Sequence, residues 1–225
     1  LQLVKTRVEY DILLKACGNG SSELMSNISG SLVSIVYNFQ LLKFAGENGV
    51  AAYGVLMYVQ FIFIAVFIGY TIGTSPVVSY HYGAGNHGEL KNLLKKSYWI
   101  TGIAGIAMML LSQGLSPALA GIFVGYDREL FDLTVHAFRL FAFSFLLAGA
   151  NIFTSSFFTA LSNGGISAAV SFLRTLVFQL ISVLVLPAFF GLDGIWWAIT
   201  VAEILAFAVS VAFLFANRKR YHYMD

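Results

Sequence analysis

The chain has 225 residues, of which 58% are hydrophobic and only 11% charged, with a net charge of +2. A soluble domain of ordinary composition carries about 25% charged residues, so this chain lacks the charge to cover a water-exposed surface. The composition excludes an ordinary soluble protein and indicates one whose solvent is the lipid bilayer.

Six long apolar segments predict six transmembrane helices. Each has about 20 residues or more, enough to cross a hydrocarbon core of about 30 Å at 1.5 Å per residue. Helices are expected because every backbone polar group in lipid needs a partner within the protein. The segments are Ser21–Phe44, Gly49–Ser75, Ser97–Pro117, Leu133–Leu161, Gly165–Pro187 and Asp193–Ala216.

The basic residues predict how this bundle is oriented. Lys and Arg gather in the N-terminal stretch, between the second and third segments and in the tail, and Arg174 is placed on that side too. Because basic loops stay cytoplasmic, both termini are expected inside. The predicted organisation is a cytoplasmic amphipathic linker (residues 1–20), a six-helix bundle (21–216) and a cytoplasmic basic tail (217–225).

The polar stretch at residues 73–97, GTSPVVSYHYGAGNHGELKNLLKKS, predicts a cytoplasmic loop between two helices. Pro76 and Gly83 are expected to act as a hinge, because proline and glycine loosen a helix end. Residues 89–96 alternate charges with leucines at helical spacing, which predicts a short amphipathic helix at the membrane interface. The alternative is a charged stop that only sets topology.

Two stripes of polar residues run along the predicted helices at steps of three and four residues, so each stripe lies on one face. Such a stripe either packs helices closely or lines a wet pathway. As pathway candidates we take Glu23, Asn27, Ser31, Ser34 and Asn38 from the first segment and Asn151 and Ser155 from the fourth.

Glu203 is predicted near the middle of the last segment. A carboxyl group there must be protonated, paired or hydrated. It is either paired with an arginine, for which Arg139 is a candidate, or it takes part in proton coupling. Glu23, near the start of the first segment, is either a helix N-terminal carboxylate favoured by the dipole or a proton or cation acceptor.

Met57, Tyr58 and Phe61 form a soft aromatic group in the second segment. If they face a cleft, they could hold flat organic cations by cation–π contact. The sequence has no phosphate-binding loop, serine elbow or Cys/His metal cluster, so neither an enzyme nor a bound cofactor or metal is expected.

Three stretches resemble the multidrug and toxic compound extrusion (MATE) family in order and spacing. The first is GTSPVVSYHYGA (residues 73–84), which is similar to the family's loop after the second helix of each half. The second is GVAAYG (residues 49–54), preceded by Asn38 and Gly46. The third is GLDGIWWA (residues 191–198), followed by Ala202 and Glu203.

The resemblance implies a transporter made of two homologous six-helix bundles, of which this chain is similar to the second. The implied partner is the N-terminal six-helix half, in the plasma membrane. Some family members carry acidic cation ligands midway along the first and fourth helices of this half. Ser31 and Asn151 stand there instead, which argues against a sodium site in this half and favours proton coupling in the first.

The resemblance thus implies efflux of drugs or organic cations by antiport with H⁺ or Na⁺ through alternating access. Two other interpretations remain open. One is a flippase for lipid-linked sugars, which predicts a cationic cleft. The other is a non-transporting membrane assembly module, which predicts that the polar stripes are buried in packing.

Overall fold

The computed structural model describes residues 10–223, apart from the side chains of Asn19, Ser21, Ser22, Glu23 and Met25. Within that range the chain is helical with short turns and contains no strand. The elements are α1 (Tyr10–Gly83), α2 (His87–Val124), α3 (Arg128–Phe141), a 3₁₀ turn η1 (Ala142–Ser144), α4 (Phe145–Ala160), α5 (Gly164–Phe172), a π-helical turn η2 (Leu173–Phe178) and α6 (Gln179–Tyr221).

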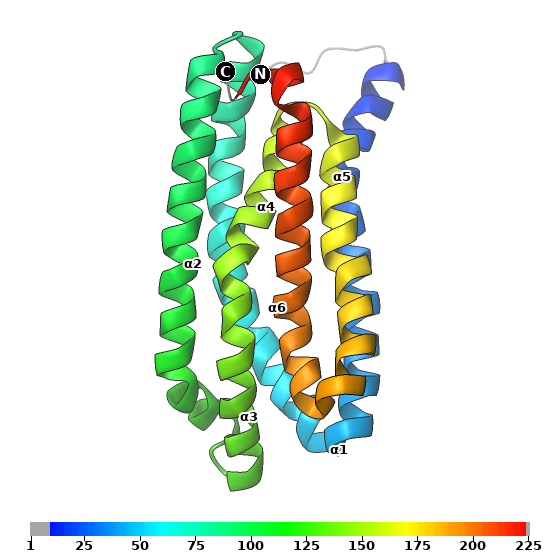
Figure 1. Cartoon of the computed structure of the whole chain (residues 1–225), viewed down its shortest axis with the longest axis vertical. Coiled ribbons are helices and arrows are strands. Elements are labelled where there is room, and N and C mark those ends of the chain that lie inside the picture. The colour runs from blue at the N-terminus through cyan, green and yellow to red at the C-terminus, as the bar shows by residue number, and fades with distance from the viewer. Residues whose placement is uncertain (1–9, 224–225) are drawn as a thin grey trace, which may run out of the picture.

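Four helical runs in the described chain are long and apolar enough to cross a membrane: Ser26–Gly83, His87–Val124, Arg128–Ala160 and Gly164–Tyr221. This confirms the predicted all-helical membrane architecture. The six expected segments, however, are not six separate helices. The first and last runs each contain two helices joined at a kink, and the chain reverses its direction there (Figure 1).

The two reversals use the same glycine pattern, a Gly-x-x-Gly step at residues 46–49 and 191–194. Gly46 (φ 61°, ψ −151°) and Gly191 (φ 57°, ψ −135°) are the non-helical residues. A backbone with this positive φ is accessible to glycine at little cost and strains other residues. The sequence predicted connecting segments of several residues at 45–48 and 188–192. In the structure, each connection is about one non-helical residue.

The second glycine of each pattern permits close approach of the two helices. A Cβ at Gly49 would lie 2.7 Å from the Cβ of Ala45, and one at Gly194 would lie 2.5 Å from the backbone of Leu186. The reversal therefore needs glycine twice, once for its dihedral angles and once for its lack of a side chain.

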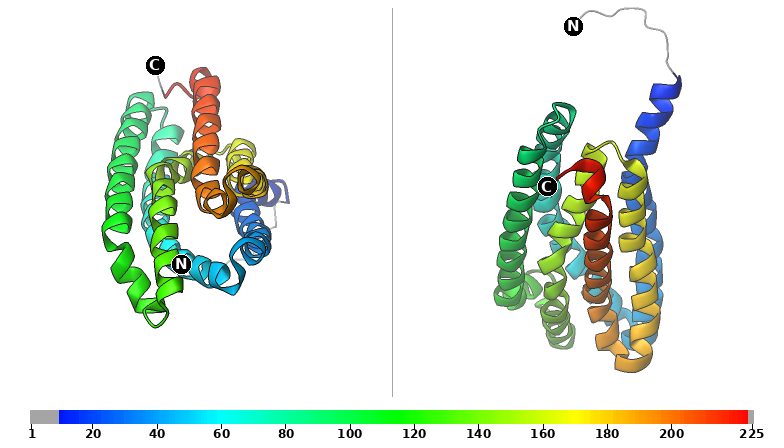
Figure 2. Two further views of the ribbon diagram at one scale, coloured as in Figure 1. Left: turned by 60° about the horizontal axis from the view of Figure 1, so that its bottom comes forward. Right: turned by 45° about the horizontal axis from the view of Figure 1, so that its top comes forward.

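The helices pack side by side, with both described chain ends at the upper end in Figure 1. The turns at residues 84–86 and 161–163 lie at this upper end, and the two glycine reversals lie at the lower end (Figure 1). In the views of Figures 1 and 2, α2 and residues 10–45 of α1 lie on opposite sides of the bundle. Large buried side chains, among them Phe138, Phe145 and Trp196, fill the centre.

The prediction of a loop hinge and a separate interfacial helix at residues 73–97 is wrong. Pro76 lies inside α1, which continues to Gly83. The turn comprises residues 84–86, and its left-handed residue is Gly85 (φ 66°). α2 then begins at His87, where the side chain of the preceding Asn86 accepts a hydrogen bond from the Glu89 amide (3.2 Å).

Packing explains why residues 89–96 form part of α2 and not a separate interfacial helix. Leu90 and Leu94, expected to lie on the membrane surface, are buried in a second cluster with Phe153, Phe157 and Val78. Because the apolar face of residues 89–96 has a protein partner, this segment continues straight into α2.

The expected domain boundaries also shift in the structure. Residues 10–20 are continuous with α1 and do not form a separate linker helix. At the other end, α6 extends past residue 216 to Tyr221, and the Tyr223 hydroxyl donates to the Leu214 carbonyl (2.8 Å). The predictions for residues 1–9 and 224–225 lie outside the described range.

The glycine reversals give a first prediction. Gly191→Ala and Gly46→Ala should each lower the free energy of unfolding by about 1–3 kcal/mol, because alanine is strained at these dihedral angles. Gly102→Ala is the control, since a Cβ there meets nothing within 4 Å in a regular helix. Thermal unfolding in detergent measures the effect. Equal stability of all three variants would contradict the role assigned to the reversals.

Candidate functional site

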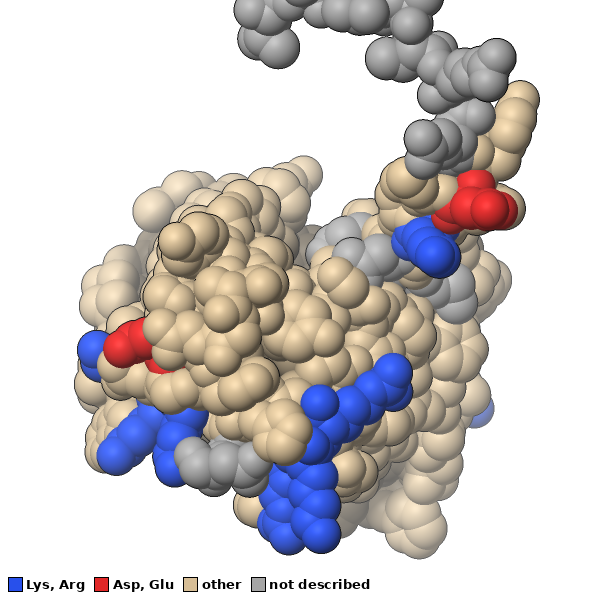
Figure 3. Space-filling model, turned by 90° about the horizontal axis from the view of Figure 1, so that it is seen from above, with Lys and Arg blue, Asp and Glu red and all other residues tan. Residues whose placement is uncertain are grey.

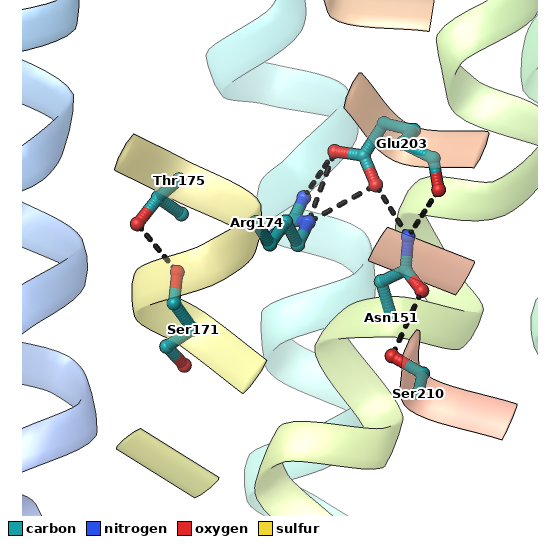
Figure 4. A network of polar contacts seen from close by, with 6 residues as sticks. All are labelled: Asn151, Ser171, Arg174, Thr175, Glu203 and Ser210. Atoms are coloured by element: carbon teal, nitrogen blue, oxygen red, sulfur yellow. Dashed lines mark hydrogen bonds and ion pairs between the residues drawn. The ribbon is translucent and has the colours of Figure 1, made fainter. Parts of the chain in front are cut away.

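A charged pair lies in the interior of the bundle. Glu203 of α6 is only 2% exposed, and the Arg174 side chain from η2 is 15% exposed. Arg174 Nε donates to both carboxylate oxygens (3.0 Å each), and its Nη2 donates to Oε1 (2.7 Å). Figure 4 shows the two side chains pointing toward each other from neighbouring helices.

Asn151 of α4 completes this network. Its Nδ2 donates to Glu203 Oε2 (2.7 Å) and to the Glu203 backbone carbonyl (3.0 Å). Its Oδ1 accepts a hydrogen bond from Ser210 Oγ (3.2 Å). The polar atoms of Asn151 are therefore held on both sides, and the network joins α4, η2 and α6 (Figure 4).

Arg174 lies in an irregular stretch of backbone. Residues 173–178 form a π-helical turn, which is rare and is often found at functional sites. Such a wider turn shifts the side chains that follow it around the helix, compared with a regular α-helix. A charge at this depth is stabilised only when it is paired and fully hydrogen-bonded, and the network supplies both conditions.

The expected partner of Glu203 needs correction. Arg139 was the candidate, but its side chain is exposed, and its backbone carbonyl accepts a hydrogen bond from Gln113 Nε2 (2.7 Å). Arg174, which the charge pattern placed among the cytoplasmic residues, is the actual partner. The signal was present in the sequence, since an arginine inside an apolar segment usually pairs with an acid.

A cavity of about 560 Å³, with both polar and apolar side chains in its lining, lies beside this network, and we call it the inner cavity. Its lining includes Asn27 and Thr71 of α1, Asn151 and Ser155 of α4, Ser171 of α5 and Arg174. The Ser155 hydroxyl lies 2.8 Å from Ser171 Oγ and 2.9 Å from Ser167 Oγ. Two predicted polar stripes therefore meet around one cavity.

A second, open hollow of about 530 Å³ lies on the α1 hairpin, and we call it the aromatic hollow. Tyr53 lines this hollow. Its lining also includes five of the predicted pathway residues, which are Ser34, Asn38, Met57, Tyr58 and Phe61. Tyr53 stacks on buried Tyr37 with ring centres 5.2 Å apart. Asn38 also lines a neighbouring hollow of about 600 Å³, which includes Glu47.

The remaining predicted residues lie around these two sites. Ser31 is exposed between them, and its hydroxyl donates to the Asn27 carbonyl (3.3 Å). Glu203 lies behind the inner cavity, where Arg174 holds it. The side chain of Glu23 lies outside the described residues. Sequence reasoning missed Arg174, Ser171, Ser210 and Glu47 as members of these sites.

The ion pair gives a second prediction. Arg174→Met should lower the free energy of unfolding by about 3–5 kcal/mol, because it leaves the Glu203 carboxylate unpaired in the interior. The double variant Arg174→Met/Glu203→Gln should recover most of that loss, since no charge then remains. Arg139→Met is the control on an exposed arginine. Thermal unfolding of the purified protein measures all three, and a double variant less stable than Arg174→Met would contradict the pairing.

The comparisons with known proteins agree with this architecture. A family model described as MatE matches residues 24–185. The multidrug export protein MepA of Staphylococcus aureus (strain MSSA476) is 25% identical over 199 residues, which cover 88% of this chain and 43% of MepA. The probable multidrug resistance protein YoeA of Bacillus subtilis (strain 168) is 25% identical over 213 residues, which cover 88% of this chain and 43% of YoeA.

Solved structures are similar in fold. An outward-facing multidrug resistance MATE family transporter of the MOP superfamily superimposes with a TM-score of 0.91 at 21% identity, covering 99% of this chain and 50% of that one. A MOP superfamily transporter from Pyrococcus furiosus gives a TM-score of 0.82 at 22% identity, covering 94% and 48%. The chain therefore spans about half the length of the relatives it matches. With the family model matching residues 24–185, the chain belongs to the MatE family.

Proposed function

We propose that this chain forms the C-terminal half of a multidrug efflux transporter that exports organic cations by antiport with H⁺ or Na⁺. In this proposal it lies in the plasma membrane with both termini in the cytoplasm, and it works by alternating access with an N-terminal six-helix half. Family membership and the aromatic hollow support the proposal, and the hollow is the observation that carries it.

The chemistry of the hollow suits a flat, hydrophobic cation. Tyr58 and Phe61 offer ring faces that attract cations, and Met57 adds a flexible, polarisable surface that adapts to different shapes. Asn38 and Ser34 supply a few hydrogen-bonding groups. A pocket of this kind binds many ligands loosely, as multidrug transport requires.

Charge also favours cations over anions. In the described part of the chain, neither the aromatic hollow nor its neighbour is lined by Lys or Arg, whereas the neighbour is lined by Glu47. A flippase for lipid-linked sugars would need positive groups for its anionic head group, so we favour drug efflux over that alternative.

An assembly module would bury its polar stripes. Here Asn38 and Phe61 line an open hollow, and Phe61 is 78% exposed. We propose that the N-terminal half faces this hollow and that the drug is bound between the halves. Rocking of the two halves would then open the hollow to one side of the membrane at a time.

For the coupling ion we propose a site in the N-terminal half. The carboxylate of Glu203 already receives four hydrogen bonds from Arg174 and Asn151. A carboxylate with that many donors has little capacity left for a coupling cation. In this proposal Glu203 fixes the positions of α4, η2 and α6 around the pathway.

A third prediction tests the hollow. In cells that express the intact transporter, Phe61→Ala and Tyr58→Ala should raise ethidium accumulation at least about two-fold, because a cation–π contact contributes about 0.5–2 kcal/mol. Phe189→Ala is the control, since Phe189 is equally exposed and lines neither hollow. Wild-type efflux from both hollow variants at normal expression would refute this binding site.

A fourth prediction tests the role of Glu203. The double variant Arg174→Gln/Glu203→Gln should keep ethidium efflux that stops when the proton gradient, or in a sodium-driven case the sodium gradient, is collapsed. The reason is that two neutral amides can still hydrogen-bond across the helices. Loss of efflux from a double variant that folds and expresses normally would place the coupling site at Glu203 instead.

A further inference from the structure

A groove between α2 and α6 lies away from both sites described above. It measures about 590 Å³, and none of the described residues of α1 lines it. Its lining includes Lys91, Lys95 and Trp99 of α2 and Phe207, Val211 and Phe215 of α6. We call it the α2–α6 groove.

The groove exists because α2 and α6 are not packed directly on each other. α2 packs mainly on α3 and α4, and α6 packs mainly on η2, α1 and α4. Tyr223, beyond the end of α6, covers part of the gap: it is fully buried and also lines the groove.

The groove has a charged head and an apolar body. α2 begins at the upper end, so Lys91 and Lys95 lie in its first turns. α6 ends at the same end, and the guanidinium of Arg218 lies over the ring of Phe215, 5.8 Å from its centre. Below this level the lining is hydrocarbon and aromatic. Phe207 to Phe215 span about 12 Å along α6, comparable to the upper part of an acyl chain.

The charged residues among the described lining of the groove are Lys91 and Lys95, and no acidic side chain is among them. Glu89, in the first turn of α2, accepts a hydrogen bond from Asn92 (3.3 Å). It stands two positions from Lys91, on another face of the helix. Seen from above, Lys and Arg side chains gather along one side of this end face (Figure 3).

We propose that the α2–α6 groove binds an anionic phospholipid. Its phosphate is held by Lys91, Lys95 and Arg218, and an acyl chain lies against Trp99, Phe207 and Val211. Basic pockets between transmembrane helices are suited to such head groups, and aromatic residues near the head-group level anchor the interface. The lipid fills the gap between α2 and α6 and holds the two helices together.

A free phosphate ion does not fit this description, because it leaves the apolar body of the groove empty. Trp99 is 64% exposed and Phe215 52% exposed, so the body of the groove opens to the flank of the bundle. A bilayer supplies both the anionic head and the chain at this place. Charge and shape therefore point to the same occupant.

The test is lipid-dependent stability of the intact protein in detergent, compared between phosphatidylglycerol and phosphatidylcholine with the same acyl chains. Phosphatidylglycerol should raise the melting temperature more, and Lys95→Gln should weaken its apparent affinity about five-fold, the effect of one cation near an anionic lipid. Lys96→Gln is the matched control, because Lys96 is the adjacent residue and does not line the groove.

Further experiments distinguish the contribution of the charged head of the groove from that of its apolar body. Val211→Trp fills the groove while keeping every cation, so it should abolish the preference for phosphatidylglycerol. If that variant fails to fold, Phe215→Ser removes apolar lining without added bulk and should weaken lipid binding. Inorganic phosphate at equal concentration should give no stabilisation.

Three results would overturn the proposal. The first is equal loss of affinity in Lys95→Gln and Lys96→Gln, which indicates general surface attraction. The second is an unchanged lipid preference in Val211→Trp or Phe215→Ser, which removes the acyl site. The third is stabilisation by inorganic phosphate as strong as that by phosphatidylglycerol.

Discussion

The organisation of this bundle depends on one buried charge pair. Glu203 is almost fully buried and Arg174 is largely buried, so each is stabilised by the other and by the hydrogen bonds around them. The pair draws η2 toward α6, and Asn151 ties α4 to the same point. Polar side chains of α1, α4 and α5 then surround the cavity that remains beside it. In a hydrocarbon solvent, a packing that separates Arg174 from Glu203 leaves two charges unpaired and is therefore costly.

Two regions of the bundle surface differ in their chemical character. The α1 hairpin bears an open hollow with rings, a thioether and amides, and α2 with α6 bears a groove with a cationic head and an apolar body. In the views of Figures 1 and 2, α2 lies across the bundle from residues 10–45 of α1. In the transporter that we propose, this chain presents one face to the N-terminal half and another to lipid, without conflict between the two.

Much of this was predictable from the sequence because membrane segments are governed by length and hydropathy. Steps of three and four residues place the polar residues of the first segment near one another along the helix, and the structure divides them between two sites. Asn27 lines the inner cavity, whereas Ser34 and Asn38 line the aromatic hollow. Asn38, Tyr58 and Phe61 do line one hollow. Periodicity groups residues within one helix, but which face of the neighbouring helix they meet is given only by the structure.

The predictions that were wrong concern features that depend on contacts between segments distant in the sequence. Leucines at helical spacing indicate an apolar face but do not say whether lipid or protein covers it, so Leu90 and Leu94 were misplaced. Arg174 could have been preferred to Arg139 because it lies inside an apolar segment, but the π-helical turn that contains it has no clear sequence signature. The kinks at Gly46 and Gly191 were mistaken for loops because glycine signals both.

The glycine reversals also bear on how the protein enters the membrane. With about one residue between its two helices, neither arm of such a hairpin has slack to cross the bilayer while the other waits outside. In the proposed orientation, with both termini in the cytoplasm, each pair is therefore suited to enter as a preformed hairpin whose glycine tip leads. Glu47 directly follows Gly46, and Asp193 lies two residues after Gly191. In this route each acidic residue crosses the membrane at the tip of its hairpin. The unit of membrane insertion for these segments is then a helical hairpin rather than a single helix.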